Sequence, residues 1–278
     1  MKKYTLIGHP LSHSMSPFIH AKLFEMANRT ATYDCTDISP VNLKEEIAKI
    51  NLLDGYNVTI PHKVSVIPFL HKLDTSAQRY GAVNCVNNQN GLLTGYNTDC
   101  DGFLLSVKNL PLSEKVLLLG CGGVGRMMAI EAALHKADLT IAIIEEAKPA
   151  AEMLLKEISE ISPDSKVKVI DIHNINDNYN LLINATPVGM YPHSENCPVS
   201  EKVIENCDSF FDAIYNPTKT KLIKLAEKLD KPAVGGMAML VYQAVKAHEI
   251  WNNDFYSDEQ IKSLIELSER KVMEDFKQ

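Results

Sequence analysis

A glycine-rich segment that follows a short apolar run constrains the fold of this chain more than any other feature. The apolar run covers 116–119 and leads directly into Gly120, Gly122 and Gly125, which have the spacing G-x-G-x-x-G. Short continuous apolar runs are typical of buried parallel strands. Between a strand and a helix, the first glycine permits a tight turn, the second lets backbone approach a pyrophosphate, and the third allows close packing. The segment therefore predicts the strand–turn–helix unit of a dinucleotide-binding domain.

The residues of this turn are the predicted contacts to the dinucleotide, because free N–H groups at a helix N-terminus stabilise a bound phosphate. An alternative is a glycine turn that only connects strand to helix, but the flanking pattern favours the binding site. The predicted contacts are Gly120, Cys121, Gly122, Gly123, Val124 and Gly125.

The end of the next strand, 139–144, bears on the choice of dinucleotide. Glu145 follows it, about 20 residues after Gly125, where such sites contact the ribose. A carboxylate there accepts hydrogen bonds from the 2′-hydroxyl of NAD and repels the 2′-phosphate of NADP. The local charge therefore favours NAD, although Lys148 is close enough in sequence to meet a phosphate.

Strand-like and helical segments alternate along the chain, which predicts the α/β class. In the N-terminal part this alternation favours a parallel sheet covered by helices. We expect helices that begin at Ser16-Pro17 with Ser16 as the N-cap, that carry Leu43 and Ile47, and that run from about 101 to about 111. We expect strands at 3–7, 31–36, 55–60, 116–119, 139–144, 167–170, 181–184 and 209–213, and two helices after 237.

The length of 278 residues is large for one hydrophobic core, so we expect two domains. An N-terminal α/β domain covers 1–101 and is predicted to bind the substrate and carry catalysis. A doubly wound dinucleotide domain of the Rossmann type covers 102–236. Helices within 237–278 are expected to return and pack on the N-terminal domain.

Charge and residue spacing argue against several classes of function. The net charge of −7 comes with no Lys/Arg-rich run, so neither nucleic acid nor a membrane is a favoured partner. The six cysteines form no C-x-x-C pair, so no metal site is expected and a reducing cytoplasm is the predicted location. Gly8 and Pro10 interrupt the first apolar segment too early for a signal peptide.

Seven short motifs occur in a fixed order along the chain. They are Gly8–Pro17, Asn57–Lys63, Gly81–Asn84, Gly95–Asp99, Asn184–Met190, Asp212–Pro217 and Met239–Ala244. Together with the glycine turn they resemble the motifs of shikimate dehydrogenases over nearly the whole chain. This resemblance implies reversible hydride transfer between a nicotinamide dinucleotide and a ring carbon, which interconverts shikimate and 3-dehydroshikimate in aromatic amino acid biosynthesis.

The resemblance implies that Lys63 and Asp99 are the catalytic pair. Oxidation of an alcohol needs a group within hydrogen-bond reach that accepts the hydroxyl proton as hydride leaves. Lys63 accepts this proton after losing its own, or it stays charged and stabilises the developing alkoxide while Asp99 or water carries the proton. Without the motifs, Lys63 would be interpreted as a surface lysine and Asp99 as a helix cap ahead of Phe103.

The resemblance also implies the contacts to both ligands. Ser14 and Ser16 match the hydroxyl pair that holds the substrate carboxylate, and neutral donors bind this anion without adding a positive charge beside Lys63. A serine at position 16, where the quinate-oxidising branch often has threonine, favours shikimate over quinate. The other matched substrate positions are Thr59, Asn84, Asp99, Tyr215 and Gln243, and Ile214 and Gly236 are matched on the dinucleotide side.

The segment after the second strand of the dinucleotide domain differs from that of many family members. Many members that use NADP carry Asn-Arg-Thr after the second strand of the dinucleotide domain, whereas this chain has Ile144, Glu145 and Glu146. The family thus implies NADP(H), whereas the local charge favours NAD(H).

His13 and His62 are expected at the surface or behind the substrate contacts, without a metal. The alternatives are an NAD-dependent quinate/shikimate dehydrogenase and a non-catalytic ligand sensor, and the protein is expected to be a monomer or a homodimer.

Overall fold

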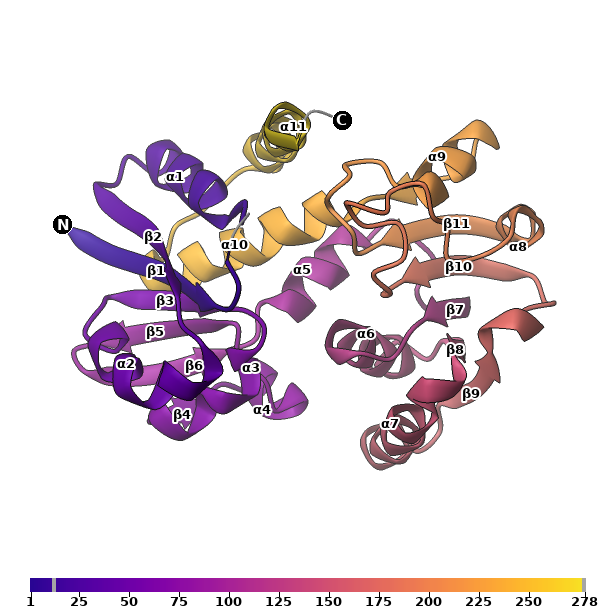
Figure 1. Cartoon of the computed structure of the whole chain (residues 1–278), viewed down its shortest axis with the longest axis horizontal. Coiled ribbons are helices and arrows are strands. Elements are labelled where there is room, and N and C mark those ends of the chain that lie inside the picture. Colours follow the sequence, from indigo (N-terminus) through magenta and orange to yellow (C-terminus); the bar gives the residue numbers. More distant parts are fainter. Residues whose placement is uncertain (12–13, 277–278) are drawn as a thin grey trace. The chain divides into compact units, whose positions relative to one another are not determined.

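The structure is a computed structural model that describes residues 1–11 and 14–276, and it divides into two compact units. The first unit contains Met1–Gly102 and Leu240–Ser268, and the second contains Phe103–Met239 and Glu269–Gln278. Each unit is built on one six-stranded sheet that is flanked by helices (Figure 1). The predicted α/β class is confirmed, whereas the last residues of the expected C-terminal segment, 277–278, lie outside the described residues.

The sheet of the first unit has the strand order β2-β1-β3-β5-β6-β4. The strands β1, β2 and β3 are parallel, β5 runs antiparallel to both β3 and β6, and β4 is parallel to β6. The expectation of a parallel sheet in this part of the chain was therefore wrong, because a hairpin reverses the chain direction. The bounds are β1 Lys2–Gly8, β2 Ala31–Asp37, β3 Gly55–Val58, β4 Lys72–Leu73, β5 Cys85–Gln89 and β6 Leu92–Tyr96.

The hairpin turns at Asn90 and Gly91, whose φ angles are 54° and 89°. A two-residue turn with both residues in the left-handed region matches the twist of the two strands, and Asn-Gly is the favoured pair there. The turn fixes the register, so that Gln89 pairs with Leu92 and, at the far end, Cys85 pairs with Tyr96. The residues just before β5 and just after β6 are thereby brought together.

Helices cover both faces of this sheet. On one face, Ile7, Ile47 and Tyr56 belong to a core formed with α2 and α4. On the other face, the rings of Tyr4 and Trp251 stack at 4.5 Å beside α1 and α10. The helical segments of this unit are α1 Ser16–Met26, η1 Pro40–Asn42, α2 Leu43–Ile50, α3 His62–Ser65, η2 Ile67–Phe69, α4 Thr75–Tyr80 and parts of α10 Gly236–Asn252 and α11 Asp258–Phe276.

Trp251 ties the C-terminal helices to the sheet of the first unit. Its indole N–H donates to the carbonyl of Val86 at 2.9 Å. The indole lies against Gly55, where a Cβ atom would stand 2.6 Å from the indole nitrogen. A side chain at position 55 would therefore displace Trp251.

The sheet of the second unit is entirely parallel, with the order β12-β11-β10-β7-β8-β9. The order reverses between β7 and β10, which is the point where doubly wound sheets bind ligands at the carboxyl ends of their strands. The residues of β7, β10 and β11 that face α8 and α9 form one core. The strands are β7 Lys115–Leu119, β8 Asp138–Ile143, β9 Lys166–Asp171, β10 Tyr179–Asn184, β11 Cys207–Asp212 and β12 Ala233–Val234.

The first helical residues of the second unit belong to the C-terminal part of α5. This helix spans Asp99–Ser106, so the helix expected from about 101 to 111 begins earlier and ends sooner. A turn with a hydrogen bond from Leu110 N to Val107 O replaces its predicted last part. The other helical segments are α6 Gly123–Leu134, η3 Glu145–Ala147, α7 Lys148–Ile161, η4 Ile172–Asn174, α8 Glu201–Glu205 and α9 Lys221–Lys228.

The hairpin turn provides a test of the first unit. A Cβ atom at Gly91 would contact nothing within 4 Å, so Gly91→Ala changes only the strain of a left-handed backbone. We expect it to lower the free energy of unfolding by about 1–2 kcal/mol in urea denaturation. Asn90→Gly is the matched control and should cost little, because glycine adopts the same φ freely. Equal stability of Gly91→Ala and the wild type would contradict a left-handed turn at this position.

Candidate functional site

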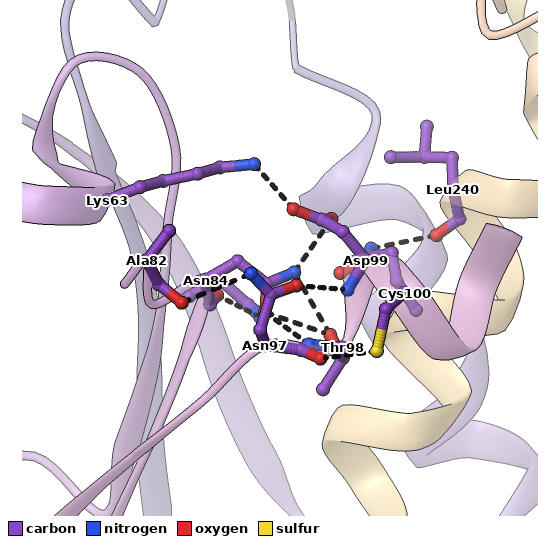
Figure 2. A network of polar contacts seen from close by, with 10 residues as sticks. Lys63, Ala82, Asn84, Asn97, Thr98, Asp99, Cys100 and Leu240 are labelled. Carbon is purple, nitrogen blue, oxygen red and sulfur yellow. Dashed lines mark hydrogen bonds and ion pairs between the residues drawn. The ribbon is translucent and has the colours of Figure 1, made fainter. Parts of the chain in front are cut away.

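Lys63 and Asp99 form an ion pair in the first unit (Figure 2). The Nζ atom of Lys63 donates to Oδ2 of Asp99 at 2.6 Å, and the two side chains are 25% and 17% exposed. The other carboxylate oxygen, Oδ1, accepts from Nδ2 of Asn84 at 2.8 Å. Both oxygens of Asp99 therefore have a donor, and the ammonium group of Lys63 keeps further N–H donors for a ligand.

The hairpin explains how these residues meet. Asn84 precedes β5 and Thr98 follows β6, so the paired strands hold them side by side. The amide oxygen of Asn84 accepts from the backbone N of Thr98 at 2.7 Å, and its Nδ2 also donates to Thr98 Oγ1 at 3.1 Å. The sequence did not reveal this second function of Asn84, because it depends on the strand register.

Asn97 performs the capping function that was considered for Asp99. The side-chain oxygen of Asn97 accepts from the backbone N of Asp99 at 3.2 Å, and Asp99 is the first residue of α5. The interpretation of Asp99 as a helix cap was therefore wrong. Asn97 itself is fixed by donation from Nδ2 to Ala82 O at 3.1 Å, which leaves the carboxylate of Asp99 to Lys63 and Asn84.

Lys63 is held by the turn that follows β3. The backbone N of Thr59 donates to Ile7 O, and His62 N donates to Thr59 O, both at 2.9 Å. The carbonyl of Lys63 accepts from Val83 N at 2.7 Å, which joins the motif of Lys63 to the motif of Asn84. These backbone bonds bring the segments of Thr59, Lys63 and Asn84 together.

At the start of α1, Ser14 and not Ser16 uses its side chain to stabilise the helix end. The N-cap of α1 is Met15, and Ser16 is the first helical residue, so the prediction of Ser16 as N-cap was wrong. Instead Ser14 Oγ accepts from Ser16 N at 3.2 Å and stabilises this helix end. The hydroxyl of Ser16 is therefore not used by the helix terminus.

The other predicted substrate residues and the two motif histidines lie in different parts of the structure. Gln243 lies on α10, where it is buried and donates from Nε2 to the carbonyl of Leu240 at 2.8 Å. His62 is buried, and its Nε2 lies 2.6 Å from Ile38 O, so it is not a surface residue. His13 lies outside the described residues. Tyr215 belongs to the second unit, where burial raises the pKa of its hydroxyl.

The glycine turn of the second unit has the shape that a dinucleotide requires. Gly120 has φ of 87°, and a Cβ atom at Gly125 would stand 2.4 Å from Gly120 O. Gly122 is the N-cap of α6 without a side-chain partner, and neither it nor Gly123 would bring a Cβ atom near any other atom. Gly122 and Gly123 are exposed, and the first N–H groups of a helix have no partner within the helix, so this helix start fits a pyrophosphate.

The side chains next to this turn differ in their exposure. Cys121 is buried, its Sγ lies 3.8 Å from Ala147 O, and burial raises the pKa of its thiol. Val124 is half-buried in the first turn of α6. Glu145 begins η3 after β8 and forms an exposed ion pair with Lys148 at 2.7 Å.

A buried carboxylate organises the strand ends next to this turn. Asp212, at the end of β11, accepts from Asn184 Nδ2 and Ile214 N at 3.0 Å and from Thr220 Oγ1 at 2.7 Å. Burial raises the pKa of Asp212 to about 6, and the three donors act against this rise. Asp212 belongs to one of the sequence motifs, but this function could not be predicted from the sequence because it depends on the complete burial of the side chain.

The other two predicted dinucleotide residues meet at the same edge. The backbone N of Gly236 donates to Ile214 O at 3.1 Å. A Cβ atom at Gly236 would stand 2.2 Å from Ala213 O, so no other residue fits here without backbone movement. Ile214 and Gly236 are therefore brought together in the second unit.

Among residues 1–11 and 14–276, no group of three or more His, Cys, Asp and Glu side chains could hold a metal ion. None of the helices within these ranges combines the length and the apolar character that are needed to cross a bilayer.

A doubly wound unit with a glycine turn, together with an α/β unit that carries a lysine–carboxylate pair, defines a dinucleotide-dependent oxidoreductase. Comparison with known proteins specifies the family. Residues 6–86 match the model of the shikimate dehydrogenase substrate binding domain. The NADP(+) shikimate dehydrogenase of Caldanaerobacter subterraneus subsp. tengcongensis is 36% identical over 263 residues, which are 92% of this chain and 93% of the relative.

Solved structures agree with this relationship. A shikimate dehydrogenase crystallised with NADP+ has a TM-score of 0.86 and 35% identity, covering 95% of this chain and 94% of the other. Shikimate 5-dehydrogenase of Listeria monocytogenes, in complex with shikimate and NAD, has a TM-score of 0.85 and 28% identity, covering 95% and 96%. The chain belongs to the shikimate dehydrogenase family.

Substitutions at Gly125 and Gly123 distinguish an effect on packing from an effect on dinucleotide binding. Gly125→Ala places Cβ against backbone and should lower the free energy of unfolding by about 1–3 kcal/mol. Gly123→Ala adds its methyl group in open space at a helix start, so stability should not fall, while dinucleotide affinity should fall roughly tenfold. Denaturant unfolding and calorimetric titration of NAD and NADP would measure both effects. Unchanged affinity in Gly123→Ala would argue against a phosphate at this helix terminus.

Proposed function

We propose that the protein is a shikimate dehydrogenase that interconverts shikimate and 3-dehydroshikimate with a nicotinamide dinucleotide. The observation that carries the proposal is the Lys63–Asp99 ion pair, held by Asn84 in the unit that matches the substrate-binding domain model. Ser14 and Ser16, in the same unit, are proposed to bind the substrate carboxylate through neutral donors. Thr59 and Gln243, also in this unit, are proposed to contact the ring.

The proposed chemistry uses the ion pair as one acid–base unit. When bound, the dinucleotide supplies the hydride donor or acceptor. In the reduction direction, Lys63 donates a proton to the ketone oxygen of the substrate as hydride reaches the carbonyl carbon, which leaves a neutral amine beside Asp99. In the oxidation direction this amine takes the hydroxyl proton as hydride leaves the carbon. Asp99, fixed by Asn84, orients Lys63 and stabilises its charged form.

Substitution of the pair tests this proposal. Lys63→Ala should lower kcat for shikimate oxidation on the order of 10²- to 10⁴-fold, because the proton loses its acceptor. Lys49→Ala is the matched control, since Lys49 forms an exposed ion pair with Glu46 on α2 of the same unit. Reduced-dinucleotide absorbance with shikimate and either NAD or NADP would measure both variants. Absence of turnover by the wild type with both dinucleotides would reject the proposed function.

We propose further that NAD is preferred over NADP. Supporting this preference, Glu145 is the second residue after the end of β8, where a carboxylate accepts hydrogen bonds from the ribose 2′-hydroxyl. Its ion pair with Lys148 engages the nearby cation that a 2′-phosphate would need.

We also propose that Ser16 favours shikimate over quinate as the substrate. For location and assembly, the prediction stays a cytoplasmic monomer or homodimer.

The dinucleotide preference depends on one side chain in this proposal. Glu145→Ala should reduce the ratio of kcat/KM for NAD to that for NADP by roughly tenfold, because the repulsion of the 2′-phosphate is removed and Lys148 is released. Glu146→Ala, next to it in η3, is the control and should keep the wild-type ratio. A wild-type preference for NADP, or an unchanged ratio in Glu145→Ala, would reject the assignment.

A further inference from the structure

The segment that leads to Ser14 leaves the first sheet at the carboxyl ends of its parallel strands. Gly8 is the last residue of β1 and Asp37 is the last residue of β2, and the two residues pair in the sheet. The turn that carries Lys63 leaves the same edge, after Val58 at the end of β3. Ligands of parallel sheets bind beyond the carboxyl ends of the strands. Asp37 therefore lies at the edge from which both segments of the proposed site extend.

Asp37 holds the start of the Ser14 segment with both of its carboxylate oxygens. Oδ1 lies 2.6 Å from Nδ1 of His9, and Oδ2 accepts from the backbone N of Leu11 at 2.9 Å. Because an ionised carboxylate can only accept, His9 Nδ1 is the donor. The bond from His9, and then the bond from Leu11, hold the pKa of Asp37 below its usual value, so Asp37 is charged at neutral pH. Leu11 is three residues before Ser14 in the sequence.

The same segment start packs against the turn that carries Thr59. The backbone N of His9 donates to Ile60 O at 3.0 Å. A Cβ atom at Gly8 would stand 2.4 Å from Cγ2 of Thr59, so the absence of a side chain at position 8 permits this close approach. The bonds of Asp37 to the next residues thus fix the segment where it passes a proposed ring contact.

The other end of the segment is fixed by α1. Ile19 and Leu23 bury this helix in the first unit. Ser14 Oγ accepts from Ser16 N at 3.2 Å, and this bond leaves the O–H proton of Ser14 for donation to a substrate carboxylate. The position of the Ser14 hydroxyl therefore depends on α1 on one side and on Asp37 on the other.

We infer that Asp37 is a positioning residue for the substrate carboxylate. It fastens the segment before Ser14 to the sheet edge that also carries Lys63, so that one substrate can place its carboxylate at Ser14 and its reacting oxygen at Lys63. Asp37 does not bind the anion itself, because His9 and Leu11 occupy its two oxygens. The inference rests on the proposed function, because it takes Ser14 as a carboxylate ligand.

Asp37→Ala tests the inference. For shikimate, KM should rise roughly three- to fivefold while kcat stays within about twofold, because Ser14 loses its fixed position and Lys63 keeps Asp99. Shikimate methyl ester has no anionic carboxylate and makes weaker hydrogen bonds to a serine hydroxyl, so its KM should rise less. The ratio of kcat/KM for the acid to that for the ester should therefore fall. Asp37→Asn should restore part of this ratio, since its amide oxygen can still accept from Leu11 N.

Asp34→Ala is the matched control, because Asp34 is an exposed aspartate on the same strand β2. It should keep the wild-type acid-to-ester ratio, and thermal melting of all variants would report any loss of stability. If Asp37→Ala does not fold, the ratio in Asp37→Asn decides. An unchanged ratio in the folded Asp37 variants, or equal losses for acid and ester, would overturn the inference. An inactive wild type would instead reject the proposed function itself.

Discussion

The amide of Asn84 is the interaction on which the first unit's site depends. A single side chain accepts a hydrogen bond from the backbone of Thr98 and donates one to the carboxylate of Asp99. It can do both only because a two-residue turn at Asn90 and Gly91 sets the register of the hairpin. The partly buried ion pair would cost free energy to desolvate, and these neutral donors satisfy the oxygen that Lys63 leaves open.

The second unit depends on a different constraint, which is the absence of side chains. Gly120, Gly125 and Gly236 each stand so close to neighbouring atoms that a methyl group would require them to shift. The buried carboxylate of Asp212 then connects the ends of β10 and β11 through hydrogen bonds to Asn184, Ile214 and Thr220. The edge of the sheet is thus shaped by close packing and a satisfied charge.

The sequence predicted those parts that depend on local pattern. The glycine turn, the parallel strands of the second unit and the motif residues were recognised because their spacing is itself the signal. The antiparallel hairpin was missed because its first strand is rich in Asn and Gln and lacks apolar alternation, although Asn90-Gly91 is a strong turn signal. Ser14 stabilises the start of α1 in place of Ser16 because Met15 is already helical, and no residue pattern specifies this conformation.

The position of Trp251 in the chain has a consequence for how the protein forms during synthesis. The core of the first unit needs this residue, which donates to Val86 and stacks on Tyr4. Trp251 is translated only after nearly all of the second unit. Until then α1 alone covers the Tyr4 face of the N-terminal sheet, while all the strands of the second unit have already been made. The last helices of the chain complete the first unit, so a ribosome that stops before them releases a chain with an exposed apolar surface.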